Sequence, residues 1–418
     1  MITDRQGHAL TGAGHDAAAH YDRATTAFHL YRGDPLAALD AALAASPRFT
    51  MAALLKAHLM AVATEPAATQ AAHALLADMA GWRMDARERS HHRAAQQVLA
   101  GEWSAAARVL DLHHLEWPHD LVALQLGHLV DFYRGNARSL RDRIARTLPQ
   151  WSSTMPGHGF LLGMHAFGLE ECGQYAQAEA AGRAALQAEP QDCWAHHAVA
   201  HVMEMQGRHE DGIGWALVRE PHWGGADNFF RVHNAWHRAL CHLELGQFAA
   251  ALSIYDDMVR ATRSPVALDM VDASALLWRL QLCGHDVGGR WHELAEAWDA
   301  HADGRSYAFN DWHAAMAWLG AGRTGDVDRL AQSLRGAGQG SEAARWAGGT
   351  GADLVEGFAA FWRGRHDEAI EHLWRGRAIA NQFGGSHAQR DIIDWTLTEA
   401  ALRGGRRALA EALAHERL

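Results

Sequence analysis

Titratable side chains cluster in the segment HHAVAHVMEM. His197, His201 and Glu204 are spaced i, i+4 and i+7, so a helix would place them on one face. His233 and His237 repeat the i, i+4 spacing further along the chain. Imidazole and carboxylate groups from neighbouring helices can together hold a divalent metal ion such as zinc. These four histidines and one glutamate are therefore the candidate metal ligands.

The same side chains have two other interpretations. Histidine titrates near neutral pH, so His201 and His237 with Glu204 are also candidates for metal-free acid–base catalysis. Asp311 and His313 are a second candidate acid–base pair, although their i, i+2 spacing points them to different faces of a helix. The third interpretation is structural, because a histidine pair beside a carboxylate can satisfy its own hydrogen bonds inside a core. The zinc motif HExxH is absent, and the spacing alone leaves the three interpretations open.

Other side chains of the same region are candidates for binding a small-molecule substrate. Tryptophans beside the histidines can wall a pocket, and Arg279 can bind a substrate carboxylate or neutralise Asp272. The candidate substrate-binding residues are His128, Trp194, Trp236, Asp272, Arg279 and Asn310. Cys241 follows His237 by four residues and offers a Cys–His nucleophile, although most free cysteines in helices are inert.

The composition argues against several classes of function. The formal net charge is −11 over 418 residues and no block of basic residues occurs, which disfavours binding to nucleic acid or to anionic membranes. Lys56 is the only lysine, and the GxSxG and GxxxxGK[ST] motifs are absent, so lysine chemistry, serine hydrolysis and a phosphate-binding loop are not expected. Four dispersed cysteines indicate reduced thiols, and no apolar run reaches the length of a membrane span. We expect a cytoplasmic protein.

Helical hairpins are the elements that must position these side chains. Segments such as ECGQYAQAEAAGRAALQAEP and ELGQFAAALSIYDDMV each place a glycine before an alanine-rich stretch. Such a glycine ends one helix in the left-handed conformation, and the alanines let the next helix pack closely. Gly101 to Gly135 and Gly173 to Gly207 are both 34 residues, the period of tetratricopeptide repeats. The expected turn glycines are Gly33, Gly101, Gly135, Gly173, Gly207, Gly246, Gly284, Gly322, Gly364 and Gly404.

This periodicity predicts an all-α protein without strands. We expect a right-handed α-α superhelix (solenoid) of about eleven tetratricopeptide-like hairpins, because one hairpin cannot bury its apolar face alone. The predicted organisation is a single continuous domain over residues 1–418, with capping repeats at 1–90, a histidine-rich core at 91–325 and C-terminal repeats at 326–418. The first helix of each hairpin should line the concave surface, so the two histidine stripes should face a shared groove. HDAAAHYD near the N-terminus and the pair His113–His114 are expected in solvated loops.

A more specific pattern occurs between about residue 90 and residue 325. It consists of the segments DLVALQLGHLVDFYRG, FGLEECGQYAQAE, WAHHAVAHVMEMQGRHEDGIGW, HNAWHRALCHLELGQFAAALSIYD, VDASALLWRLQLCGHDVGGRW and FNDWHAAMAWLGAG. With their spacing, these segments resemble the tetratricopeptide repeat protein 38 family. The positions that match the family pattern are His128, Glu170, Trp194, His197, His201, Glu204, His233, Trp236, His237, Asp272, Arg279, Asn310, Asp311 and His313, whereas His165 and His196 depart from it. The family has no settled biochemical activity, so the resemblance implies positions and no reaction.

Two functions from different classes follow from these observations. The first is an enzyme or small-molecule-binding protein with metal-assisted or acid–base chemistry of the hydrolase or lyase type. The second is a scaffold that binds a peptide or a partner protein in its groove. Scaffold grooves display lysine, arginine and asparagine, and the near absence of lysine and asparagine on the histidine stripes favours the pocket.

Overall fold

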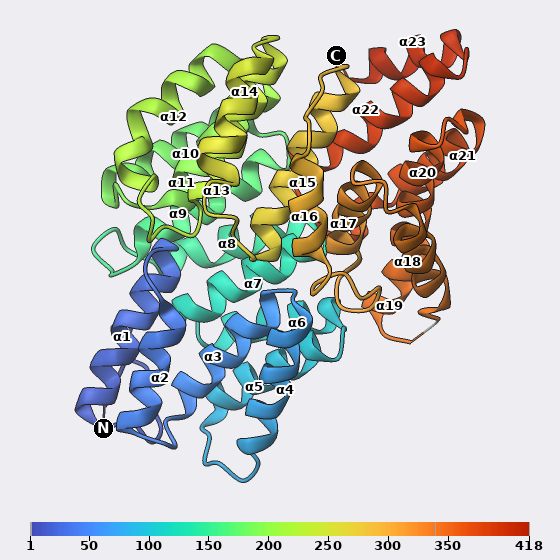
Figure 1. Ribbon diagram of the computed structural model, residues 1–418. Coiled ribbons are helices and arrows are strands. Elements are labelled where there is room, and N and C mark those ends of the chain that lie inside the picture. Colours follow the sequence, from blue (N-terminus) through green and yellow to red (C-terminus); the bar gives the residue numbers. More distant parts are fainter. Residues whose placement is uncertain (1, 339, 418) are drawn as a thin grey trace. The chain divides into compact units, whose positions relative to one another are not determined.

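The computed structural model describes residues 2–338 and 340–417, and its regular secondary structure is helical (Figure 1). Within these ranges no strand forms, and β-type pairing is limited to two isolated bridges, Thr3 with Ala9 and Arg32 with Asn228. The prediction of an all-α protein is confirmed. Across the same described residues, no helix combines the length and the apolar character that crossing a membrane requires.

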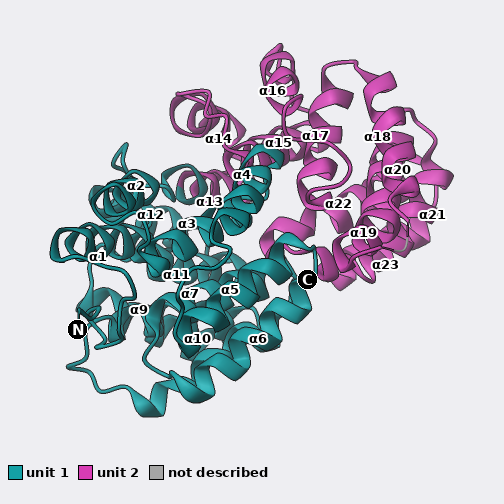
Figure 2. Cartoon of the chain, turned by 90° about the horizontal axis from the view of Figure 1, so that it is seen from below, with its two compact units in different colours: residues 1–234 teal, residues 235–418 magenta. Residues whose placement is uncertain are grey.

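The chain divides into two compact units, residues 1–234 and residues 235–418 (Figure 2). The division falls inside α13 (Arg231–Glu244), which is one continuous helix. The prediction of one continuous repeat domain is not tested by this division and stays a prediction.

The first unit is a run of α-helices with one short 3-10 turn. Its elements before α13 are α1 (His15–Leu30), α2 (Pro35–Ala45), α3 (Thr50–Val62), α4 (Pro66–Asp78), α5 (Ala86–Leu99), α6 (Trp103–Glu116), α7 (Leu121–Tyr133), α8 (Ala137–Thr147), η1 (Leu148–Gln150), α9 (His158–Glu170), α10 (Tyr175–Ala188), α11 (Cys193–Met205) and α12 (His209–Trp223).

The second unit continues from α13 in the same style, with two π-helical turns and one 3-10 turn. Its elements are α14 (Phe248–Ile254), η2 (Tyr255–Val259), α15 (Ala267–Leu282), α16 (Arg290–Trp298), α17 (Ala308–Gly320), α18 (Thr324–Gly336), α19 (Glu342–Trp346), η3 (Ala347–Gly351), α20 (Ala352–Trp362), α21 (His366–Arg377), η4 (Ala380–Phe383), α22 (His387–Arg403) and α23 (Arg407–Glu416).

Consecutive helices pack as hairpins, and the hairpins stack through their first helices. In the first unit α3 packs on α4, α5 on α6, α9 on α10 and α11 on α12, while α5 also contacts α3 and α11 contacts α9. In the second unit α15 packs on α16, α17 on α18, α20 on α21 and α22 on α23, while α17 contacts both α15 and α20. This is the arrangement of a tetratricopeptide-like helical solenoid.

The turn glycines follow the predicted pattern with one shift. Nine of the ten expected glycines have a positive φ, for example 72° at Gly173 and 67° at Gly207. At the last turn the left-handed residue is Gly405, with φ 74°, whereas Gly404 caps α22 at φ −80°. Gly404 and Gly405 are adjacent, so the sequence alone does not show which of them adopts the left-handed conformation. In the structure it is Gly405.

Two segments that we expected to be solvated loops are helical. His113 and His114 lie in α6, exposed by only 1% and 6%, and His113 Nε2 donates a hydrogen bond to Asp120 Oδ2 at 3.2 Å. HDAAAHYD forms the start of α1, where Ala17 and Tyr21 are buried. The loop prediction was wrong in both places. Each segment lies in an amphipathic helix, in which polar residues share the helix with side chains that enter the core.

Candidate metal centre

Two helices present the predicted histidines in pairs one turn apart. In α11 the Asp192 side chain caps the N-terminus by accepting a hydrogen bond from Ala195 N at 3.0 Å, which fixes where the helix starts. His197 and His201 follow on the buried side of this helix. His233 and His237 hold the same relationship on α13.

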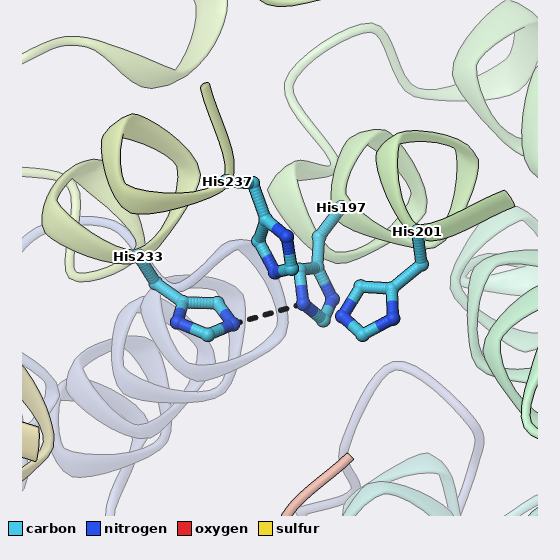
Figure 3. Close-up of side chains that lie close together, drawn as sticks. All are labelled: His197, His201, His233 and His237. Carbon is cyan, nitrogen blue, oxygen red and sulfur yellow. Dashed lines mark hydrogen bonds between the residues drawn. The ribbon is translucent and has the colours of Figure 1, made fainter. Parts of the chain in front are cut away.

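The four imidazoles converge in space. Each ring offers one nitrogen, and these nitrogens all lie within 4.8 Å of one another (Figure 3). His197 and His233 share a hydrogen bond of 3.0 Å between their Nε2 atoms, and the ring centroids of His197 and His201 are 4.4 Å apart. His201, His197 and His237 are buried, while His233 is half-buried.

This donor set fits a transition-metal ion. Imidazole nitrogen suits Zn²⁺, Cu²⁺ and Ni²⁺, whereas Mg²⁺ and Ca²⁺ prefer oxygen. Zinc–nitrogen bonds of about 2.0–2.1 Å place tetrahedral ligands about 3.3 Å apart. The 3.0 Å distance between Nε2 of His197 and Nε2 of His233 is slightly shorter than this spacing, and the 4.8 Å within which all four nitrogens lie is longer. Burial lowers the pKa of His201 to about 4, so its ring is neutral at pH 7, the form that binds metal.

A buried carboxylate lies beside His201. Glu170 Oε2 at the end of α9 lies 3.4 Å from His201 Nδ1, and neither side chain has exposed surface. Glu170, Glu171 and His201 form a second group whose potential ligand atoms lie within 4.8 Å of one another. Sequence reasoning found Glu170 only as a position of the family resemblance. The available signal was its place on the first helix of the preceding hairpin, one repeat before His201.

Aromatic rings surround the first histidine pair. Phe167 lies 5.3 Å from both His197 and His201 by ring centroids, and Trp194 lies 5.3 Å from His197. His128 meets the edge of Trp194 at 5.4 Å. The candidate substrate residues Trp194 and His128 therefore lie beside the histidines, as packed neighbours with 6% and 1% exposure.

Glu204 lies outside the four-histidine group. It is half-buried near the C-terminus of α11, and its charge acts on His201 from a distance. The position is three residues beyond His201, so the side chain follows the helix toward its exposed end. Cys241 is buried on the same helix as His237.

In the second unit, Trp236 and Arg279 are partners. Trp236 packs edge-on against His237 at 4.8 Å, and the Arg279 guanidinium lies 5.4 Å from the Trp236 ring. Arg279 Nη2 donates to the carbonyl of Ala388 at 2.7 Å. The remaining candidates on α15 and α17, Asp272 and Asn310, are both buried.

Asp311 and His313 lie on α17 and contact different backbone groups. Asp311 Oδ1 accepts a hydrogen bond from Gly304 N at 3.0 Å, and burial raises the pKa of this carboxyl to about 8. His313 Nδ1 donates to the carbonyl of Phe309 at 2.8 Å, and burial lowers the pKa of the ring to about 3. At neutral pH both groups are therefore uncharged.

Sequence reasoning missed a further histidine cluster in the first unit. Asp120 Oδ2 accepts hydrogen bonds from Arg87 Nη1 at 2.8 Å, His91 Nε2 at 2.9 Å and His113 Nε2 at 3.2 Å. All four side chains are buried. The guanidinium supplies the positive charge that the carboxylate needs, which makes this cluster a buried ion-pair network. Its only sequence signal is the i, i+4 pair of Arg87 and His91.

Comparison with known proteins adds little to this geometry. No protein-family model matches the chain. A chain of the hetero-tetramer Cut9–Hcn1 of APC/C aligns over 91% of this chain and 76% of its own length, with 11% identity and a TM-score of 0.40. A chain of Naa15/Naa10 bound to HypK-THB aligns over 96% and 74%, with 11% identity and a TM-score of 0.24. The class of this protein, a tetratricopeptide-like helical-repeat protein, therefore rests on its own hairpins.

Proposed function

We propose that this chain binds one transition-metal ion, with zinc as the first candidate, through His197, His201, His233 and His237. The observation that carries the proposal is the convergence of four ring nitrogens within 4.8 Å. A helical repeat needs apolar side chains at such positions for packing. Neutral imidazoles each carry one lone pair, and a single ion satisfies four of them at once.

The ligand number bears on what the ion does. Bound zinc supplies a Lewis acid, and it lowers the pKa of water only where a coordination position is open. Four histidines complete a tetrahedral set, which favours a closed, stabilising site that links α11 to α13. His233 is the half-buried member of the four. Hydrolase or lyase chemistry on a small-molecule substrate would therefore require His233 to leave the ion.

The repeat architecture favours a second candidate function. Stacked hairpins expose extended surfaces that suit a peptide or a partner protein. In this second candidate function, the metal stabilises the scaffold and the partner binds elsewhere on its surface. The proposal includes the resemblance to the tetratricopeptide repeat protein 38 family, since the four histidines are among the positions that match the family pattern. It also includes a cytoplasmic location.

Zinc titration of the untagged, chelator-treated full chain tests the proposal. The parent is expected to bind one Zn²⁺ per chain. His201→Ala and His237→Ala are expected to lose zinc but to stay folded, with melting temperatures near that of the metal-free parent, because ligand residues are often installed at some expense in stability. His73→Ala, at an exposed position of α4, is the control and should bind zinc as the parent does.

Two results would count against metal binding. A parent protein that takes up no zinc would remove the proposal. If His201→Ala instead unfolds at a much lower temperature and the parent binds no metal, the histidines are structural and the scaffold function takes over.

A further inference from the structure

The metal centre needs His201 to present one particular ring nitrogen. A neutral imidazole carries a proton on either Nδ1 or Nε2, and only the other nitrogen can bind an ion. His201 Nδ1 faces Glu170 Oε2 at 3.4 Å, with both side chains out of contact with solvent. A carboxylate accepts hydrogen bonds and donates none, so the stable arrangement keeps the proton on Nδ1 and leaves the lone pair on Nε2.

We propose that Glu170 is the positioning residue of this metal centre: it accepts the Nδ1–H of His201 and so directs Nε2 toward the ion. This inference rests on the proposed function. Carboxylates in this role fix the tautomer and the orientation of a ligating imidazole and raise its basicity. Glu170 also offsets charge, because four neutral imidazoles leave the two positive charges of the ion without compensation.

The packing of three helices holds the two residues in place. Leu169, Ala178 and Val202, from α9, α10 and α11, form one buried apolar cluster. Leu169 directly precedes Glu170 and Val202 directly follows His201, so this cluster fixes the backbones from which both polar side chains extend. Glu170 therefore reaches His201 from a rigid support, which positioning requires.

Glu171 supplies a matched control. It carries the same charge one residue further along and is also buried, but the 3.4 Å ion pair with His201 belongs to Glu170. Glu170→Gln removes the charge while keeping the size of the side chain. Glu170→Asp keeps the charge but withdraws the carboxylate from His201. Either variant of Glu170 tests the contact, whereas Glu171→Gln tests only the general negative charge.

A second metal ion is the competing explanation of the same carboxylates. Glu170, Glu171 and His201 could hold an ion of their own, because their potential ligand atoms lie within 4.8 Å of one another. His201 would then give one nitrogen to each ion and lose both ring protons. The number of ions bound per chain separates this arrangement from the positioning role.

The experiment measures Zn²⁺ affinity and stoichiometry by chelator competition, and the visible spectrum of the Co²⁺-loaded full chain. We expect one ion in the parent, a zinc affinity lower by about 10- to 100-fold in Glu170→Gln, and a smaller loss in Glu171→Gln, which removes a charge that acts on His201 without the 3.4 Å contact. The cobalt spectrum of Glu170→Gln should also change, because a reoriented His201 alters the coordination geometry. Glu170→Asp should bind zinc more weakly than the parent, and the melting temperatures of the metal-free proteins check that each variant folds.

Each other outcome overturns the inference in a recognisable way. If Glu170→Gln and Glu170→Asp keep parental zinc affinity and the parental cobalt spectrum, Glu170 does not position His201, although the metal site stands. If the parent binds two ions and both glutamine variants bind one, the glutamates hold a second ion. If the parent binds no zinc, the proposed function itself fails.

Discussion

Glu170 Oε2 on α9 lies 3.4 Å from His201 Nδ1 on α11, and the two side chains are wholly buried. The residues belong to consecutive hairpins, so their contact exists because the first helices of those hairpins pack on each other. Repeat stacking thus brings a carboxylate and a histidine together that no local pattern links. The histidine pairs of α11 and α13 also lie close together, although they are far apart in sequence (Figure 3).

Close approach of α10 to α11 supports this site, and Gly182 makes it possible. A Cβ atom at Gly182 would lie 2.6 Å from Val199 Cγ2, on the helix that carries His197 and His201. We expect Gly182→Ala to lower the free energy of unfolding by about 1–3 kcal/mol through overpacking, measured by denaturant unfolding.

Gly214 in α12 is the matched control for Gly182. A Cβ atom there would have no neighbour within 4 Å, and its φ is not positive. Gly214→Ala should therefore raise stability by about 0.5–1 kcal/mol, the ordinary gain for a helix interior. Equal effects of the two substitutions would contradict the packing described for α10 and α11.

The Asp120 network should be critical for folding of the first unit. Asp120→Asn removes the charge that pairs with Arg87 at 2.8 Å, leaving the buried guanidinium with the more distant carboxylate of Asp4 at 3.8 Å. We expect a loss of about 3–5 kcal/mol in unfolding free energy. The control is Asp40→Asn, which breaks an exposed pair with Lys56 and should leave the unfolding transition unchanged. A tolerated Asp120→Asn would show that the network does not stabilise the fold.

Stability should fall as the pH drops from about 6.5 to about 4. Burial lowers the pKa of several histidines from 6.5 to about 3 or 4; they are His29, His58, His91, His128, His196 and His313. The unfolded chain takes up these protons first, so stability is fully present above about pH 6.5 and is lost below it. Each histidine contributes at most about 1.4 kcal/mol per pH unit.

His58 allows this pH dependence to be assigned. Its Nε2 donates to the carbonyl of His91 at 3.0 Å, a bond that a glutamine amide can also make. In His58→Gln, the unfolding free energy should depend less steeply on pH between 6.5 and 4. The slope should decrease by about 1.4 kcal/mol per pH unit, which is the contribution of one proton. An identical slope in parent and variant would exclude His58 from the titrating group.

The repeat fold was predictable because its signals are local. Glycines at a 34-residue spacing, such as Gly101 and Gly135, mark turns that require a positive φ, and the backbone has it there. The errors arose where local polarity misled. His113 and His114 were expected in a solvated loop but are buried. Asp120, seven residues from His113, and Arg143, on a later helix, hydrogen-bond to them.

The site was predictable only within each helix. The i, i+4 spacing of His197 with His201 and of His233 with His237 indicated two pairs of candidate ligands, and the four ring nitrogens lie close together in the structure. The sequence favoured Glu204 as the accompanying carboxylate because it shares the face of α11. The nearest ion-pair contact of His201 is instead with Glu170, which only the packing of α9 on α11 reveals.

Metal content tests the central claim most directly. Untagged full-length chain and the double variant His197→Ala/His233→Ala are purified side by side without chelator, and their zinc, copper, nickel and cobalt are measured by elemental analysis. The geometry predicts about one transition-metal ion per chain in the parent and none in the double variant, with both proteins folded. Equal metal content in the two proteins, or none in a parent that has been supplied with zinc, would contradict the assignment of the four histidines as a metal centre.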